Sequence, residues 1–341
     1  MKAGKKPEKK KKTLLIVLLV LLGILSVLSV ACVIIFNYYY NKTNFEEISE
    51  ETTAPAVVES MMEEEPETLE SSLEEEILKE IMETEETEET EETEEAEEES
   101  EILNILLVGV DRRDKSWNGN SDVMMLCTVN YTKKTVTLTS FMRDLGVYIE
   151  NVGVRKLNHA FALGGGPLLV STIESNFSVD IDYYAWVDFD GAAAVIDALG
   201  GIDLTLTPAE AKFIKISGVE TTQVVHLDGE HAVLHARNRY VGGTSDYGRT
   251  QRQRDIIMAI VEKARSGGIS DLSAAANEIL PYVNHNIGQK ELLSLIVDLP
   301  EIKDFEFSQQ RVPFDGLYHS QGEYLIPSYK ETNEKLQETL K

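Results

Sequence analysis

Arginine residues gather in one short stretch of the chain, where they could bind an anion. Five of the eleven arginines lie between positions 237 and 254. A guanidinium group is a planar fork of donors that binds phosphate oxygens in pairs, so clustered arginine favours a phosphate ligand. We expect Arg237 and Arg239 to converge beyond the end of a helix. We expect Arg249 and Gln253, four residues apart, to share one face of the next helix.

The remaining two arginines of this stretch have a simpler interpretation. Arg252 and Arg254 are expected at the surface or paired with Asp255. For the other three arginines, structural ion pairing stays open as the alternative to phosphate binding.

Two aspartates flank predicted strands and form a second candidate group. Asp111 ends a predicted strand at 102–110, and Asp122 precedes another at 123–129, so both can lie at one rim of a sheet, where open α/β sheets bind ligands. Mg²⁺ prefers one or two carboxylates together with waters and substrate phosphate oxygens. The pair therefore predicts a magnesium site beside a diphosphate, with a loop-turn role for either aspartate as the alternative. Arg143, after the third strand, could supply one more cation.

The elements that must position these residues mix strands and helices. Continuous or alternating apolar runs predict strands at 102–110, 123–129, 135–139, 183–187, 202–206 and 305–312, the second and third forming a hairpin. Helical patterns cover 166–177, 190–199, 229–237, 246–265, 272–280 and 289–297, with a last polar helix. We expect an α/β fold with a central mixed sheet flanked by helices in an α-β-α arrangement.

The N-terminus predicts a membrane anchor. Residues 1–12 form a basic stub with seven lysines, and residues 13–36 form the span, in which 23 consecutive residues from Leu14 to Phe36 carry no charge. Such a run is long enough to cross a bilayer, and the lysine-rich flank belongs on the cytoplasmic side. A cleaved signal peptide is the alternative, but its apolar region is usually shorter. The expected location is the cell membrane, with a single span, a cytoplasmic N-terminus and the rest of the chain outside the cell.

Charge is distributed very unevenly after this span. The whole chain has 341 residues and a net charge of −27, yet its first 100 residues contain 9 lysines, no arginine and 27 acids. Residues 37–100, with repeated Thr-Glu-Glu, predict a disordered acidic linker, with a short helix at 73–82 as an open option. Residues 101–341 form the expected extracellular domain. Since this domain is not basic either, nucleic acid is excluded as a partner.

Seven ordered motifs lie between residues 102 and 263, namely NILLVGVDRR (104–113), SDVMML (121–126), SFMRD (140–144), KLNHAF (156–161), DALGGID (197–203), LDGEHA (227–232), and RNR (237–239) with DYGRTQRQ (246–253). Together they resemble the LytR-CpsA-Psr family of cell-wall glycopolymer transferases. Two positions depart from the family pattern, where Asn120 replaces an arginine and Met142 replaces a proline.

The resemblance implies transfer of a teichoic-acid or capsule type of glycopolymer from a polyprenyl-diphosphate carrier to peptidoglycan, forming a phosphodiester. It implies that Asp111 and Asp122 hold Mg²⁺. The diphosphate oxygens would be bound by a set of cationic and amide side chains, namely Arg143, Arg237, Arg239 and Gln253, with Arg113 and Arg249 nearby. Two other functions stay open, which are a regulatory module that binds lipid diphosphate without turnover and a pyrophosphatase acting on the same lipids.

Overall fold

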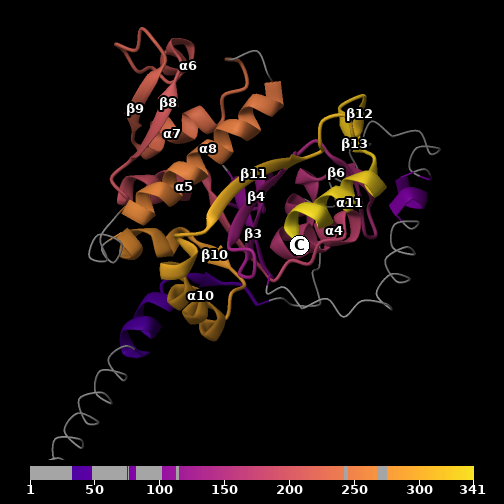
Figure 1. Cartoon of the computed structure of the whole chain (residues 1–341), viewed down its shortest axis with the longest axis horizontal. Helices are drawn as coiled ribbons and strands as arrows, with labels where there is room; N and C mark the ends of the chain where they lie inside the picture. The colour runs from indigo at the N-terminus through magenta and orange to yellow at the C-terminus, as the bar shows by residue number, and fades with distance from the viewer. Residues whose placement is uncertain are drawn as a thin grey trace, which may run out of the picture.

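A computed structural model describes residues 33–47, 75, 77–81, 102–112, 115–241, 245–266 and 275–341. Among these residues, seven strands form one mixed sheet (Figure 1). In spatial order the strands are β1 (Asn44–Phe45), β10 (Asn284–His285), β7 (Tyr183–Asp188), β2 (Ile102–Asp111), β3 (Asn120–Asn130), β4 (Thr135–Phe141) and β11 (Glu306–Val312).

Strand β2 lies at the centre of this sheet, as its uninterrupted apolar sequence predicts. It pairs parallel with β7 and antiparallel with β3, and β3 forms the predicted hairpin with β4. The chain adds β11 parallel to β4 at the far edge. The predicted mixed sheet is therefore confirmed, and each strand expected from the sequence is present within a few residues of its expected bounds.

Helices cover both faces of the sheet (Figure 1). One face is covered by α4 (Asn158–Phe177) and α11 (Tyr329–Leu340), and the other by α5 (Phe189–Ala198), α8 (Ser245–Ser266) and α10 (Gln289–Ile302). The main core lies between this first face and α4, and it includes Leu106, Val108 and Leu126 from the strands and Phe161 from the helix. Helix α4 is broken by non-helical backbone at Gly164 and Gly165.

A second, smaller core lies beside the stretch in which five of the eleven arginines gather. Here β8 (Ile202–Leu206) pairs with β9 (Gln223–Leu227), flanked by α6 (Pro208–Phe213) and α7 (Gly229–Ala236). Ile256 of α8 is buried in this core, so α8 joins the smaller core to the main sheet. Shorter elements complete the fold, namely β5 (Gly146–Ile149), β6 (Gly153–Lys156), the 3-10 helix η1 (Leu280–Tyr282), β12 (Tyr318–Gln321) and β13 (Tyr324–Pro327).

Two segments that precede β2 pack on the domain. Residues 33–40 are helical and lead into β1, which pairs with β10. The carboxylate of Glu46 accepts hydrogen bonds from Tyr184 Oη and Trp186 Nε1, both at 3.0 Å.

The second segment is a helical turn at 77–81, in which Ile77 and Ile81 are buried in the main core. Strand β1, Glu46 and this turn all lie within the range 37–100 that the sequence assigns to a linker, so parts of this range belong to the folded domain. Residues 48–74, 76 and 82–100 of that range lie outside the described residues.

Most of the predicted membrane span, residues 13–32, also lies outside the described residues. Within the part of the chain that is described, none of the helices combines the length and apolar character needed to cross a bilayer.

Candidate functional site

A β-bulge between β2 and β3 determines where Asp122 points. Gly109 pairs with Val123, but the next residue, Val110, pairs with Ser121, so Asp122 is the extra residue of the bulge. Side chains alternate between the faces of a strand, and an extra residue reverses that alternation. Ser121 consequently turns into the core, where its hydroxyl lies 3.5 Å from the carbonyl oxygen of Asn158.

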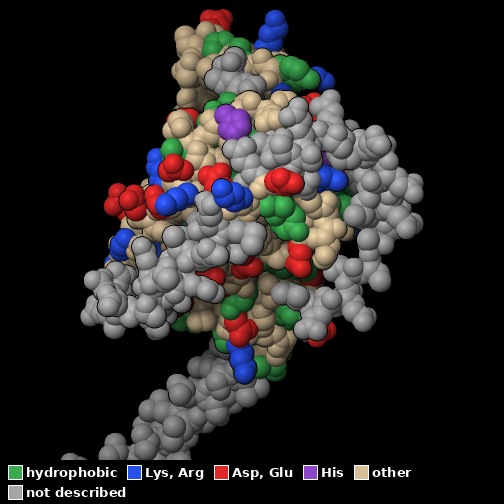
Figure 2. All heavy atoms as spheres, turned by 90° about the vertical axis from the view of Figure 1, so that its right-hand side faces the viewer, with side chains coloured by type: hydrophobic (Ala, Val, Ile, Leu, Met, Phe, Trp, Pro, Cys, Tyr) green, Lys and Arg blue, Asp and Glu red, His purple; other side chains and the backbone are tan. Residues whose placement is uncertain are grey.

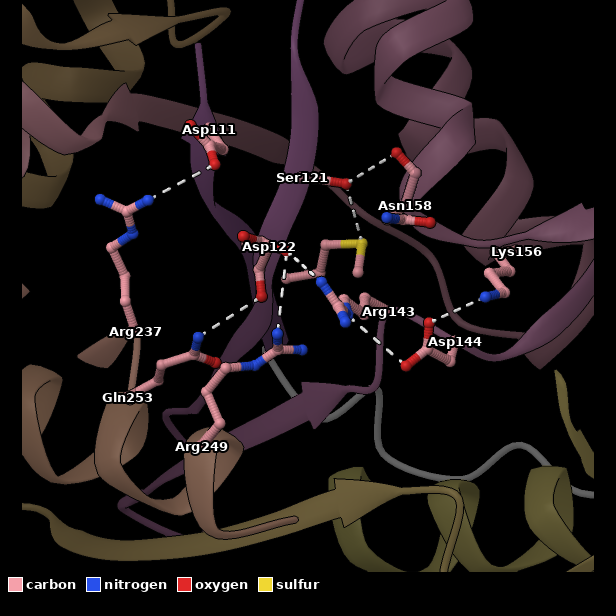
Figure 3. Close-up of polar contacts among 11 residues, drawn as sticks. Asp111, Ser121, Asp122, Arg143, Asp144, Lys156, Asn158, Arg237, Arg249 and Gln253 are labelled. Atoms are coloured by element: carbon pink, nitrogen blue, oxygen red, sulfur yellow. Dashed lines mark hydrogen bonds and ion pairs between the residues drawn. The ribbon is translucent and has the colours of Figure 1, made fainter. Parts of the chain in front are cut away.

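The carboxylate of Asp122 lies at the centre of a group of cationic and amide side chains (Figure 3). Arg143 Nη1 donates to Asp122 Oδ1 at 3.0 Å, and Arg249 Nη1 lies 4.0 Å from the same oxygen. Gln253 Nε2 donates to the backbone carbonyl oxygen of Asp122 at 3.5 Å. Arg249 and Gln253 lie on one face of α8, as their spacing predicts, since both side chains reach Asp122.

Asp111 and Arg237 form the second pair at this edge of the sheet. Asp111 is the last residue of β2 and pairs with Asn120 on β3, so both aspartates lie at the same rim. Arg237 caps the C-terminal end of α7, and its Nη2 lies 3.8 Å from Asp111 Oδ2. The guanidinium carbon of Arg237 is 4.7 Å from the ring centroid of Phe189, a stacking contact that orients the group toward Asp111.

The other two predicted site residues are Arg239 and Arg113. Arg239 lies beyond the end of α7 and is exposed, and none of the contacts among the described residues joins it to either aspartate. The expected convergence of Arg237 and Arg239 on one phosphate stays a prediction. Arg113 lies outside the described residues.

Asp144 and Lys156 belong to the same network but were assigned no role from the sequence. Asp144 Oδ2 lies 3.5 Å from Arg143 Nε, and Asp144 Oδ1 lies 3.5 Å from Lys156 Nζ. Lys156 also donates to Glu323 at 2.6 Å. This chain of alternating charges restricts the position of Arg143. Both residues lie in motifs that carry the family resemblance, and this position is the sequence signal that could have identified them.

Of the two alternatives expected for Arg252 and Arg254, a surface position is wrong, whereas the Asp255 carboxylate does act electrostatically on both, opposing the effect of burial on the pKa of each. Both are buried, at 6% and 5% exposure. Arg252 donates to the carbonyl oxygens of Asn238 and Val241 and pairs with Glu210 at 3.5 Å. Its guanidinium thereby donates hydrogen bonds to backbone carbonyl groups of the loop that follows α7. The helical pattern of the sequence does not show that this loop requires such donors.

The two positions that depart from the family pattern have different surroundings. Asn120 lies on β3 directly opposite Asp111, next to the predicted phosphate site. Met142 is buried in the main core at 3% exposure. The Asn120 departure therefore removes a cation at the site itself, while Met142 contributes to packing beside Arg143.

The arrangement has the composition of an anion-binding site. Three guanidiniums and one amide converge on two carboxylates at a strand edge, a combination suited to a diphosphate. Among the described residues, no group of three or more acidic, histidine or cysteine side chains could hold a metal by itself. Two carboxylates are still enough for Mg²⁺ when phosphate oxygens complete the coordination.

Comparison with known proteins assigns the chain to a family. A model of the LytR_cpsA_psr family matches residues 72–341. The chain belongs to this family. The match begins before β2 and so includes the helical turn at 77–81 that packs on the domain.

The chain is 35% identical over 189 residues to a curated relative from Enterococcus faecalis (strain ATCC 700802 / V583), named polyisoprenyl-teichoic acid--peptidoglycan teichoic acid transferase TagU. The alignment covers 54% of this chain and 60% of the relative. The chain thus spans about three fifths of the length of this curated relative.

Two solved structures share the fold. One, described as TagT bound to LI-WTA, has a TM-score of 0.58 and 26% sequence identity, covering 73% of this chain and 94% of that one. The other, described as LytR-CPS2A-psr family protein YwtF (TagT) with bound octaprenyl pyrophosphate lipid, has a TM-score of 0.54 and 25% identity, with the same coverage.

Proposed function

We propose that this protein is a membrane-anchored phosphotransferase that attaches a glycopolymer from a polyprenyl-diphosphate carrier to peptidoglycan. The observation that carries the proposal is the convergence of Arg143, Arg237, Arg249 and Gln253 on Asp111 and Asp122. Membership in the family and the octaprenyl pyrophosphate lipid bound to one structural neighbour support it.

The arginines have the geometry to bind the diphosphate. Arg249 is buried at 3% exposure, and Arg143 is partly buried at 17%. Little water screens their charge, so each interaction with a phosphate oxygen is stronger than it would be on the surface. The more exposed Arg237, at 37%, can turn from Asp111 toward a ligand.

The chemistry we propose is substitution at phosphorus. A hydroxyl oxygen of the peptidoglycan acceptor attacks the phosphorus attached to the glycopolymer, and the bond from this phosphorus to the bridging diphosphate oxygen breaks. The glycopolymer is joined through a phosphodiester, polyprenyl phosphate leaves, and the hydroxyl proton passes to solvent or a carboxylate. Arg143 and Arg249 stabilise the charge that develops on the phosphate oxygens.

Magnesium is the proposed cofactor, held by Asp111 and Asp122. When bound, it would neutralise charge on the diphosphate. The carboxylate set supports this assignment, because two carboxylates with phosphate oxygens match the preference of the ion.

We also propose that residues 13–36 anchor the protein in the cell membrane and that the domain is extracellular. The lysine-rich stub before the span and the uncharged run of 23 residues support this orientation. An extracellular domain would face peptidoglycan directly, and its lipid-linked substrate would lie in the same membrane.

A transfer assay tests the proposed function. The full-length protein in proteoliposomes receives a polyprenyl-diphosphate-linked glycopolymer, peptidoglycan and Mg²⁺, and the products are separated by mass. We expect glycopolymer bound to peptidoglycan and released polyprenyl phosphate, both diminished in the Arg237→Ala, Arg239→Ala double variant. Undiminished transfer in that variant would contradict the assignment. Two monophosphates formed without peptidoglycan would indicate a pyrophosphatase, and bound lipid without product would indicate a binding module.

A further inference from the structure

Helix α10 exposes an apolar stripe on its outer face. Leu293, Ile296 and Val297 are 45%, 47% and 68% exposed, and Pro300 is also exposed. These residues follow the spacing i, i+3, i+4, i+7, which places them on one side of a helix. An apolar face of this kind that is exposed to water is unusual and indicates an interaction site.

The inner face of α10 is already occupied, so the outer stripe is not simply the core-facing side of the helix. Ile302, at its C-terminal end, packs with Phe305 against the sheet. Tyr131 Oη lies 3.3 Å from Asp298 Oδ2, and Lys134 pairs with Glu301 at 3.2 Å. These contacts attach the helix to the β3–β4 turn.

The start of α10 lies beside the N-terminal helix of residues 33–40. Tyr40 Oη donates to the carbonyl oxygen of Ile287 at 3.3 Å, two residues before α10 begins. Burial and the neighbouring Glu291 carboxylate raise the pKa of Tyr40. Both helices lie at the lower end of the molecule in Figure 1. Figure 2 shows hydrophobic side chains together with acidic and basic ones at this narrow end of the described chain.

The short connection between the proposed membrane span and the sheet restricts how far this end of the domain can lie from the span. The uncharged run of the sequence ends at Phe36, and β1 begins at Asn44. Because residues 33–40 are helical, Phe36 and Tyr40 are separated by only about 6 Å along the helix axis. Strand β1 then pairs with β10, which directly precedes α10.

We propose that the outer face of α10 docks on the lipid bilayer, with the stripe of Leu293, Ile296, Val297 and Pro300 inserted at the interface. This inference rests on the membrane anchor of the proposed function. The partner is the bilayer because the helix is amphipathic and lies next to the segment that continues from the span. The domain would then have a fixed orientation on the membrane, with α10 against the lipid and the β8–β9 hairpin at the opposite end (Figure 1).

Fluorescent labels in the full-length protein test this orientation. Single cysteines replace Val297, Val224 and Ile35 in a Cys32→Ser background, and each receives an environment-sensitive thiol label. Cys127 is a free and only partly buried cysteine, so it is also replaced by alanine in this background. Val224, on β9, is a matched control, because it is also a valine with 68% exposure. Ile35 reports on the anchor itself.

The variants are reconstituted in vesicles with and without brominated phospholipid, which quenches labels in contact with acyl chains. We expect several-fold stronger quenching at position 297 than at position 224, with strong quenching at position 35. Equal, weak quenching at 297 and 224 together with strong quenching at 35 would overturn the docking and leave the anchor intact. Weak quenching at all three positions would overturn the anchor as well.

A protein partner would give a different signal. If a second copy of the chain covered α10, the label at 297 would be shielded in lipid-free detergent in a concentration-dependent way, and brominated lipid would not quench it. That result would overturn the bilayer as the occupant of this face.

Discussion

Arg143 Nη1 lies 3.0 Å from Asp122 Oδ1, although the two residues are 21 positions apart and belong to the ends of neighbouring strands. The bulge at Asp122 and the short segment after β4 bring them together at the rim of the sheet. This ion pair therefore links Asp122, a proposed Mg²⁺ ligand, to Arg143, a residue proposed to bind phosphate.

Replacing Arg143 with alanine should lower the rate of transfer by about 10² to 10³-fold, because one preorganised donor to the phosphate oxygens is lost. Steady-state transfer in proteoliposomes measures this rate. Lys212→Ala is the matched control, since Lys212 is exposed on α6, away from the site, and its removal should leave the rate unchanged. Equal rates in the two variants would show that Arg143 has no role in transfer.

Arg237 and Arg239 should differ strongly despite their proximity in sequence. Arg237→Ala removes a guanidinium held 3.8 Å from Asp111, and we expect a loss of transfer comparable to that of Arg143→Ala. Arg239→Ala alters an exposed side chain, and we expect a loss of less than about tenfold, as for a distant surface charge. Separate kinetic measurements on the two single variants decide this, and a larger effect at Arg239 would refute the proposed arrangement of the site.

The buried ion pair between Arg252 and Glu210 should stabilise the smaller core. Arg252→Ala would leave the Glu210 carboxylate and two loop carbonyl groups without this donor, at a cost of about 3 kcal/mol in the free energy of unfolding. Denaturant unfolding in detergent solution measures this value, with Lys212→Ala again as control. A loss below about 1 kcal/mol, the range of a surface pair, would argue against a structural role.

Stability should decrease as the pH falls, in part because of His285. Burial lowers the pKa of this residue on β10, and its Nδ1 accepts a hydrogen bond from the Ile287 amide at 3.1 Å. An unfolded histidine has a pKa of about 6.5, so on acidification the unfolded state binds protons first. The stability due to neutral His285 is complete above about pH 6.5 and is lost as the pH falls toward the lower, folded-state pKa.

The test compares unfolding free energies at neutral and mildly acidic pH in the wild type and in His285→Asn, which keeps an acceptor near the position of Nδ1. The free energy of unfolding of the variant should depend less on pH than that of the wild type. His159 and His235 also have pKa values lowered by burial, but they contribute to the pH dependence of stability in both proteins alike. An unchanged pH dependence would show that His285 does not titrate on unfolding.

Much of the fold was predictable because strands and helices have local signals. The apolar run before Asp111 predicted a central strand, and the four-residue spacing of Arg249 and Gln253 predicted their common face on α8. The rim position of both aspartates followed from strand order. The bulge that turns Asp122 toward α8 was not predictable, because it depends on the pairing register of β2 and β3 rather than on either sequence alone.

Polar residues with long-range partners were the least predictable. Glu46 lies in an acidic region that the sequence assigns to a linker, yet it accepts hydrogen bonds from Tyr184 and Trp186, about 140 positions away. The sequence predicts Arg252 at the surface or beside Asp255, but its guanidinium is buried and donates to the carbonyl oxygen of Asn238, 14 positions earlier. In both cases the partner is set by tertiary packing, which composition and periodicity do not encode.

The central claim is that one lipid diphosphate binds among Arg143, Arg237, Arg249 and the two aspartates. Mass spectrometry of lipid that co-purifies with the full-length protein tests it most directly, comparing wild type with the Arg143→Ala, Arg249→Ala double variant and with Lys212→Ala. We predict a polyprenyl diphosphate in the wild type and in Lys212→Ala, and its loss from the double variant. Equal amounts of this lipid in all three proteins, or its absence from the wild type, would contradict the claim.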